Sequence, residues 1–191
     1  HHCLSGDSGL YQSRSQKGPD GQDLSMSQTV LITGASRGLG LSLARVLIER
    51  GDCVYGISRT KTHWKKALAV VSRPEYFHLF QCDLTRETEI RSFFSTLKKK
   101  KPSLDLLNNN AGYGGTLSRL ESLSIKELGR HLDENFVSAF SMCKYALPLL
   151  LKATKGTILN ISSMAGVRAV PKLLGYSAAK FALGALTQCL V

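Results

Sequence analysis

Tyr176 and Lys180 are the residues of this chain best suited to proton transfer. They lie four positions apart, and residues at that spacing share one face of a helix. An ammonium group beside a phenol favours the phenolate form, which would let Tyr176 give and take a proton. Ser163 stands 13 residues before Tyr176, at the end of a predicted strand. Catalytic groups of open α/β sheets stand at such carboxyl ends.

A strand, a glycine-rich turn and a helix near the start of the chain could hold a phosphate. Thr29 to Thr33 is a β-branched apolar run typical of a buried strand, and apolar residues recur at helical spacing from Leu41 until Gly51. Helix N-termini present unpaired N–H groups, and glycines let a diphosphate approach the backbone. The alternative is a tight turn that binds nothing. The predicted cofactor contacts in this turn are Gly34, Ser36, Arg37, Gly38, Leu39 and Gly40.

The end of the second strand bears on the choice of cofactor. Cys53 to Ile57 predicts this strand, and Ser58 and Arg59 follow it. An acidic residue here would hold the ribose hydroxyls of NAD(H), whereas arginine accommodates the 2′-phosphate of NADP(H). This slot carries no carboxylate, and Arg37 offers a second guanidinium group. We therefore favour NADP(H) over NAD(H), the alternative being that both arginines are merely exposed.

The fourth predicted strand begins near Ser103 and runs into three consecutive asparagines. Asparagine is costly in a strand unless its amide is hydrogen-bonded. We therefore expect fixed hydrogen bonds for the consecutive asparagines Asn108, Asn109 and Asn110. For Asn108 the sequence offers no partner.

Further periodic segments complete an alternation of strands and helices, which predicts an α/β fold with a parallel sheet. On periodicity alone, Asn135 is an exposed polar position of a long helix. A third strand is predicted at Tyr76 to Cys82, a fifth at Gly156 to Ile161, helices at Thr60 to Ser72, Glu87 to Lys101 and His131 to Leu151, and a loop with a short helix at Leu117 to Leu128.

Together these motifs resemble the short-chain dehydrogenase/reductase family. Thr33 to Gly40 is similar to its TGxxxGxG fingerprint, Asn109 to Gly112 to its NNAG motif, and Tyr176 to Lys180 to its YxxxK motif. The resemblance implies a Rossmann-like doubly wound sheet with strand order 3-2-1-4-5. It also implies hydride transfer between NADP(H) and a small carbonyl or alcohol substrate. A nucleotide-binding module without catalysis is the alternative.

The resemblance further implies a tetrad of Asn135, Ser163, Tyr176 and Lys180. Ser163 would donate a hydrogen bond to the substrate oxygen, and Tyr176 would protonate it. Lys180 would bind the nicotinamide ribose and bias Tyr176, and Asn135 would hold a water molecule. The interval to Tyr176 selects Ser163 over Ser162.

Other cofactor contacts follow from the same resemblance. Asp83, which could otherwise be a simple helix cap, would border the adenine pocket with Leu84. Asn110, Ala111 and Gly112 would line the cofactor pocket, joined by Tyr176 and Lys180. The family usually has an aliphatic residue where this chain has Asn108.

The resemblance covers residues 29–191, so residues 28–191 are predicted to form one dinucleotide-binding and catalytic domain. Family members normally continue for two more strands, so we expect either a fragment or a reduced relative completed by another chain. Residues 1–27 lack periodicity and are predicted to be a disordered leader or tag remnant. Small residues in the last helix fit the homodimers and homotetramers common in the family.

The composition of the chain is ordinary except for its charge. With 191 residues, 43% hydrophobic and 20% charged, it is long enough for one domain. The net charge of +11 could indicate a nucleic-acid partner, but the lysine run from Lys98 to Lys101 ends a predicted helix, where cations are favourable. We therefore expect no nucleic acid. No apolar run approaches the ~20 residues of a membrane span, and the cysteines, without metal-binding spacing, predict buried thiols in the reducing cytoplasm.

Overall fold

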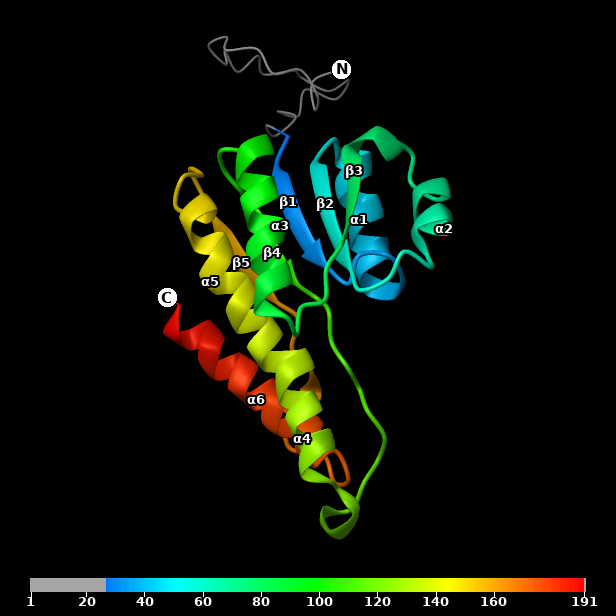
Figure 1. The fold of residues 1–191 in the computed structure, drawn as a ribbon, viewed down its shortest axis with the longest axis vertical. Helices are drawn as coiled ribbons and strands as arrows, with labels where there is room; N and C mark the ends of the chain where they lie inside the picture. The colour runs from blue at the N-terminus through cyan, green and yellow to red at the C-terminus, as the bar shows by residue number, and fades with distance from the viewer. Residues whose placement is uncertain (1–26, 191) are drawn as a thin grey trace.

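The computed structural model describes residues 27–190, and the predictions for residues 1–26 and Val191 lie outside this range. Strands and helices alternate along the chain as expected (Figure 1). The strands are β1 (Thr29–Thr33), β2 (Cys53–Ser58), β3 (Phe77–Gln81), β4 (Leu106–Asn109) and β5 (Thr157–Asn160). The helices are α1 (Gly38–Arg50), α2 (Trp64–Ala69), α3 (Glu87–Lys100), α4 (Ile125–Leu132), α5 (Ser138–Leu150) and α6 (Leu174–Cys189). Short helical turns are η1 (Pro74–Tyr76), η2 (Leu120–Ser122), the π-helical η3 (Asp133–Val137) and η4 (Met164–Gly166).

The strands form one parallel sheet in the order β3-β2-β1-β4-β5, which confirms the predicted order. Strand β1 pairs with β2 from Thr29 opposite Cys53, and with β4 from Val30 opposite Leu106. Since all the strands run the same way, their carboxyl ends meet at one edge of the sheet. The residues that follow the strands therefore gather there.

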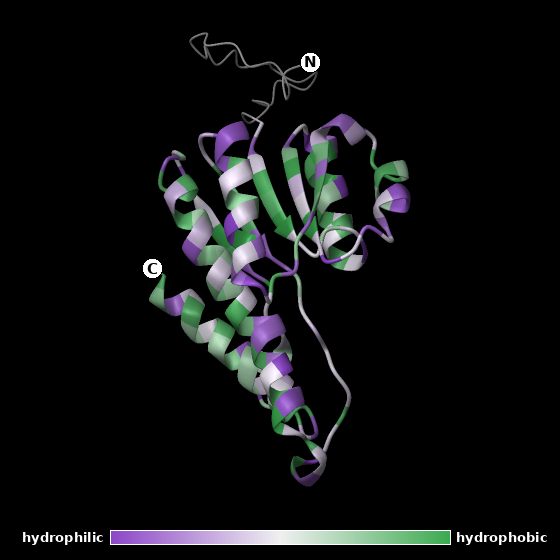
Figure 2. Ribbon diagram, in the orientation of Figure 1, coloured by the Kyte–Doolittle hydropathy of each residue, from purple (hydrophilic) through white to green (hydrophobic). Residues whose placement is uncertain are grey.

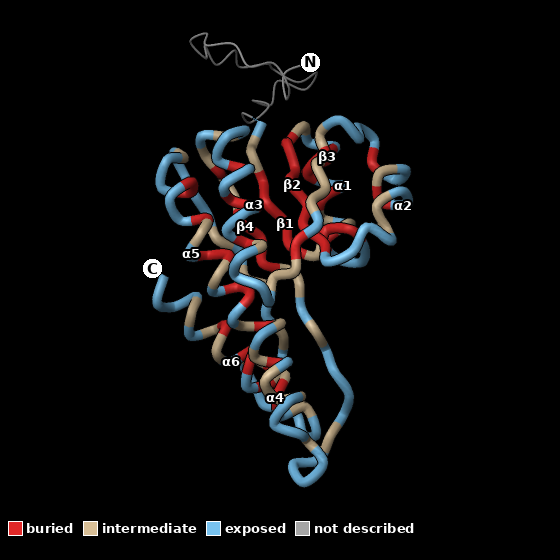
Figure 3. The backbone as a smooth tube through the Cα atoms, in the orientation of Figure 1, coloured by how far each residue is buried: buried red, intermediate tan, exposed pale blue. Residues whose placement is uncertain are grey.

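Helices cover both faces of the sheet, as the doubly wound prediction requires. One core cluster joins the sheet to α3 and α5 and includes Leu31 and Phe94. The other joins it to α1 and includes Val30 and Ile48. Hydrophobic colouring follows the central strands in Figure 2, and the same strands are buried in Figure 3. Two-sided burial explains why these strands are continuous apolar runs.

Two helices differ from their predicted limits. The helix predicted at Thr60 to Ser72 is confined to α2, because no side chain caps its start and the β-branched Val70 and Val71 follow its end. The long helix predicted from His131 begins earlier, at Ile125, because the Ser124 hydroxyl accepts a hydrogen bond from the Glu127 N–H at 3.1 Å. It then continues through η3 into α5.

The three asparagines of β4 behave differently from one another. Asn109 Nδ2 donates to Asn160 Oδ1 at 2.8 Å, linking β4 to β5, and Asn110 Nδ2 donates to the Thr33 carbonyl at 3.0 Å. The predicted hydrogen bonds of these two residues are therefore confirmed. For Asn108 the expectation is wrong, because this residue is fully buried and its amide has no hydrogen-bond partner within residues 27–190.

Two further expectations, on buried cysteines and on the lysine run, match the described residues. Cys53 and Cys82 are buried, and Lys98, Lys99 and Lys100 form the last turn of α3. None of the helices within residues 27–190 combines the length and apolar character needed to cross a membrane. The same residues contain no group of three or more His, Cys, Asp or Glu side chains arranged to hold a metal ion.

Candidate active site

Lys180 connects helix α6 to the end of β5. Its side chain is buried, with 5% of the residue exposed, and Nζ donates a 2.8 Å hydrogen bond to the Ile161 carbonyl. The same Nζ lies 5.8 Å from the centroid of the Tyr176 ring. Burial lowers the pKa of Lys180 from its ordinary value, since desolvation disfavours the ammonium. The predicted one-turn relation of phenol and amine is thus present in the fold.

Ser163 lies two residues after Ile161, whose carbonyl accepts the hydrogen bond from Lys180. Its Oγ accepts a 3.2 Å hydrogen bond from the Ala165 N–H and caps η4. Because this contact uses Oγ as an acceptor, the hydroxyl hydrogen can still be donated to a ligand. The hydroxyl of Tyr176 makes no hydrogen bond within residues 27–190.

Asn135 is buried rather than exposed, which corrects the periodicity-based expectation. Only 2% of the residue is accessible. Its Oδ1 accepts from the Tyr113 N–H at 3.0 Å, while Nδ2 donates to the carbonyls of Tyr113 and His131 at 2.9 and 3.0 Å. The π turn η3 interrupts regular helical bonding at this position. Asn135 therefore joins the long helix to the segment that follows Asn110–Gly112.

The glycine-rich turn between β1 and α1 has the backbone that its sequence requires. Gly34 has φ +69° and Gly38 has φ +56°, values that residues with a side chain rarely adopt. A Cβ at Gly40 would overlap the Gly34 carbonyl and lie 2.6 Å from Asn110 Nδ2. The turn and the end of β4 are therefore in close contact.

A cavity of about 670 Å³ opens at the carboxyl ends of β1 to β4. The predicted cofactor residues on its wall are Gly34, Ser36, Arg37, Gly38, Ser58, Arg59, Asp83, Leu84, Asn110, Ala111 and Gly112. Gly40 does not line the cavity but packs against the Gly34 carbonyl, and Leu39 beside it is 61% exposed. Lys180 approaches the same wall, because a Cβ at Gly112 would lie 3.9 Å from Nζ.

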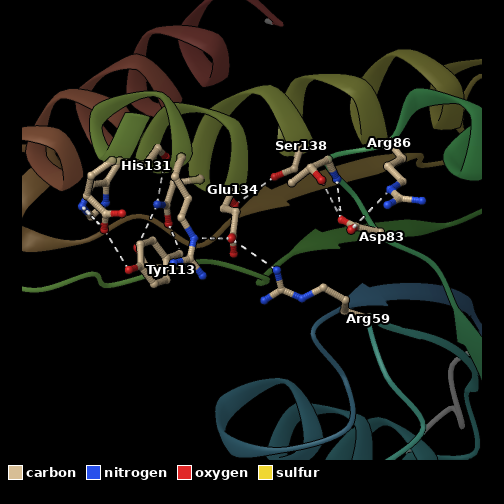
Figure 4. Close-up of polar contacts among 11 residues, drawn as sticks. Arg59, Asp83, Arg86, Tyr113, His131, Glu134 and Ser138 are labelled. Carbon is tan, nitrogen blue, oxygen red and sulfur yellow. Dashed lines mark hydrogen bonds and ion pairs between the residues drawn. The ribbon is translucent and has the colours of Figure 1, made fainter. Parts of the chain in front are cut away.

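Charged and polar groups line the far end of this cavity. Arg59 lies 3.3 Å from Glu134 Oε1, and Ser58 Oγ accepts from Trp64 Nε1 at 2.6 Å and donates to the Thr60 carbonyl at 2.9 Å. Burial alone would raise the pKa of Asp83, but the two hydrogen bonds from Thr85, with the charges of Arg59 and Arg86, lower it. Asp83 thus remains an anion near Arg59 (Figure 4).

The family model described as short chain dehydrogenase matches residues 28–191 of this chain. The chain belongs to the short-chain dehydrogenase/reductase family. A 3-ketodihydrosphingosine reductase of Bacteroides thetaiotaomicron is 36% identical over 165 residues, which are 85% of this chain and 57% of that protein. The chain therefore spans little more than half the length of this relative.

Solved structures of other short-chain dehydrogenases have the same fold. An NAD⁺-bound xylitol dehydrogenase superposes with TM-score 0.80 at 29% identity, over 85% of this chain and 63% of that one. ElxO with NADP bound gives TM-score 0.79 at 29% identity, over 84% of this chain and 65% of that one. These two members of the fold hold different dinucleotides.

The shape and lining of the cavity in this chain fit a dinucleotide. A Cβ at Gly38 would meet no atom within 4 Å, so the mouth of the turn is open, whereas one at Gly34 would lie 3.0 Å from Asn110 Nδ2. The first turn of α1 carries no acidic residue that would repel a phosphate. Gly34 to Gly38 would hold the diphosphate, and Arg37 and Arg59 are the nearby cations.

Contacts that the sequence motifs do not reveal also shape the site. Thr33 Oγ1 accepts from the N–H groups of Asn110 and Ala111, both at 3.0 Å, and so sets the distance between β1 and β4. Arg130 stacks 3.8 Å from the Tyr113 ring, and its Nε donates to Glu134 Oε1 at 2.9 Å. No motif marks Glu134, since its role depends on contact with a distant strand.

We predict that Gly40→Ala destabilises the protein and its cofactor site together. The added methyl would push against the Gly34 carbonyl, so we expect a loss of about 1–3 kcal/mol in the free energy of unfolding. Urea unfolding and cofactor titration measure the two effects. Gly184→Ala is the matched control, because Gly184 lies in α6 and a Cβ there would meet no atom within 4 Å. This substitution should stabilise the helix by about 0.5–1 kcal/mol. Equal effects of both variants would contradict this explanation.

Proposed function

We propose that residues 28–191 form the dinucleotide-binding and catalytic domain of an NADP(H)-dependent oxidoreductase that interconverts a carbonyl and an alcohol. The main support is the position of Lys180, whose buried ammonium lies beside the Tyr176 ring and holds the backbone just before Ser163. A buried lysine is costly and is retained where its charge is used. Membership of the short-chain family supports the same reaction class.

In this proposal each side chain has a limited task. Ser163 donates its hydroxyl hydrogen to the substrate oxygen, and Tyr176 transfers a proton to or from that oxygen. Lys180 stabilises the phenolate of Tyr176 and contacts the nicotinamide ribose. Asn135 positions the segment around Tyr113 through its amide and holds a water near Lys180. When bound, the dinucleotide supplies or accepts the hydride.

The preference for NADP(H) rests on Arg59 and Arg37. Both line the cavity, and guanidinium groups bind phosphate through charge-assisted hydrogen bonds. Family membership alone leaves the choice open, since the xylitol dehydrogenase is NAD⁺-bound and ElxO has NADP bound.

Arg59→Met is predicted to weaken NADPH binding selectively. We expect the Kd for NADPH to rise about 10- to 100-fold, the range for losing one or two charge-assisted hydrogen bonds. The Kd for NADH should change less than about threefold, because NADH lacks the 2′-phosphate. Quenching or enhancement of nicotinamide fluorescence measures both constants. Equal losses for both cofactors would remove Arg59 from the 2′-phosphate site.

A turnover assay tests the reaction itself. NADPH consumption is followed with aliphatic ketones, long-chain 3-keto compounds and sugars, the last two suggested by the names of the reductase and the xylitol dehydrogenase. Consumption with any of these supports an oxidoreductase. Tight cofactor binding without consumption across a broad panel would instead favour a non-catalytic nucleotide-binding module.

We further propose that two copies pair through α5 and α6 and that the protein is cytoplasmic. Phe140 and Phe181 are 46% and 45% exposed, and Ala178 and Ala185 offer small exposed positions on α6. Large exposed apolar groups near small residues suit helix pairing. Buried thiols such as Cys82, whose pKa burial raises to about 12, suit a reducing compartment. Sedimentation equilibrium measures the mass of the assembly.

A further inference from the structure

Glu134 brings a carboxylate to the arginine that the sequence assigns to a cofactor phosphate. Glu134 lies 75 residues after Arg59 in the sequence, yet Arg59 Nη1 donates a hydrogen bond to Glu134 Oε1 at 3.3 Å. The Glu134 side chain is only 13% exposed, whereas Arg59 is 55% exposed. Figure 4 shows the carboxylate between Arg59 and the long helix. The slot at the end of β2 therefore has an acidic group after all, supplied by η3.

The position of Glu134 is held from its own helix. Arg130, one helical turn earlier, donates from Nε to the same Oε1 at 2.9 Å, and the guanidinium of Arg130 stacks on Tyr113. The backbone carbonyl of Glu134 also accepts from Ser138 Oγ at 3.0 Å. Glu134 is thus held by contacts within its own helix, while Arg59 is the more solvent-exposed partner.

Glu134 also lies on the wall of the cavity itself. Together with Arg59, it lines both the 670 Å³ cavity and a neighbouring one of about 420 Å³. A phosphate that approaches Arg59 must therefore share this cation with Glu134 or displace it. Two like charges on one cation repel, and a phosphate monoester carries about −1.5 to −2 charges at neutral pH.

We propose that Glu134 determines the cofactor discrimination of this enzyme by competing with the 2′-phosphate for Arg59. The proposal rests on the dinucleotide-binding function inferred above. In it, the Arg59–Glu134 ion pair stays closed when the ribose carries hydroxyls and opens when it carries a phosphate. Glu134 lowers the preference for NADP(H) that Arg59 alone would create.

The test compares binding of adenosine 2′,5′-bisphosphate and 5′-AMP by calorimetry, which does not depend on turnover. Glu134→Gln keeps the shape and removes the charge. We expect it to tighten the bisphosphate about 10-fold, because Arg59 no longer has to give up a charge-assisted hydrogen bond to Glu134 before it binds the phosphate. Binding of 5′-AMP should change less than about twofold. NADPH and NADH are titrated in parallel and should follow the same pattern.

Three controls make the result specific. In an Arg59→Met background, Glu134→Gln should gain less than about twofold, because the shared cation is gone. Glu121→Gln, which removes an exposed carboxylate 3.9 Å from Arg119, should leave both ligands unchanged. Thermal unfolding checks that each variant is folded, and Glu134→Ala repeats the measurement if the glutamine variant is not.

The outcomes separate this inference from the function on which it rests. An unchanged or weaker binding of the bisphosphate in Glu134→Gln, with wild-type protein binding both dinucleotides, would overturn the competition and leave the proposed function intact. The same gain in the Arg59→Met background would also overturn it. Wild-type protein that binds neither dinucleotide would overturn both.

Discussion

Tyr176→Phe is expected to lower kcat by about 1,000-fold or more while the Kd for NADPH changes less than about threefold. The hydroxyl of Tyr176 makes no hydrogen bond to the described residues 27–190, so its removal should leave the fold unchanged. Proton transfer by a positioned side chain contributes about 100- to 10,000-fold to a rate. Steady-state turnover and cofactor fluorescence measure the two quantities on the same samples.

A control variant tests whether the loss of turnover is specific to the Tyr176 hydroxyl. Tyr76→Phe removes a phenol hydroxyl from η1, distant in the chain from α6, and should retain wild-type turnover. If Tyr176→Phe kept more than about a tenth of the wild-type kcat, another group would have to supply the proton. A large rise in the Kd for NADPH would instead show that the Tyr176 hydroxyl acts mainly by binding the cofactor.

Lys180→Met is expected to lower kcat about 100-fold or more and yet to leave thermal stability equal or higher. Among the described residues 27–190, the buried ammonium has one hydrogen-bond partner, the Ile161 carbonyl, and burial lowers its pKa. The unfolded chain therefore binds this proton more tightly than the folded one, so the charged lysine destabilises the fold at neutral pH. An apolar side chain of similar length removes that cost.

The pH dependence of stability checks the same argument. For the wild type, the free energy of unfolding should gain a favourable contribution as the pH rises from the lowered folded pKa of Lys180 toward the ordinary lysine value. Lys180→Met should lack this contribution. Lys155→Met, at an exposed position between α5 and β5, is the control and should match the wild type in both turnover and stability. A clear loss of stability in Lys180→Met would show that the hydrogen bond outweighs desolvation.

Features set by local chemistry could be predicted from the sequence. The glycine turn, the spacing of Tyr176 and Lys180, and the strand order follow from backbone conformation, helical periodicity and recognised motifs. The start of α4 was missed although Ser124 and Glu127 form a capping pattern that the sequence displays. Apolar periodicity alone places the start of the long helix at His131, after this cap.

Features set by contact between distant segments could not be predicted. A polar residue within an amphipathic helix usually faces solvent, yet Asn135 is buried because a π turn directs it at the backbone of Tyr113. Arg59 and Glu134 meet only when the sheet brings β2 beside the long helix. Neither partner carries a signal for the other in its neighbouring residues.

The central position of β1 has a consequence for the order in which a growing chain can mature on the ribosome. Residues 29–81 supply three adjacent strands, so that half of the sheet can assemble as soon as it emerges. The other edge of β1 must wait for Leu106–Asn109, and Arg59 meets Glu134 only after 75 further residues are synthesised. Nascent protein would therefore complete the glycine-rich turn before the residues that we propose for catalysis are synthesised.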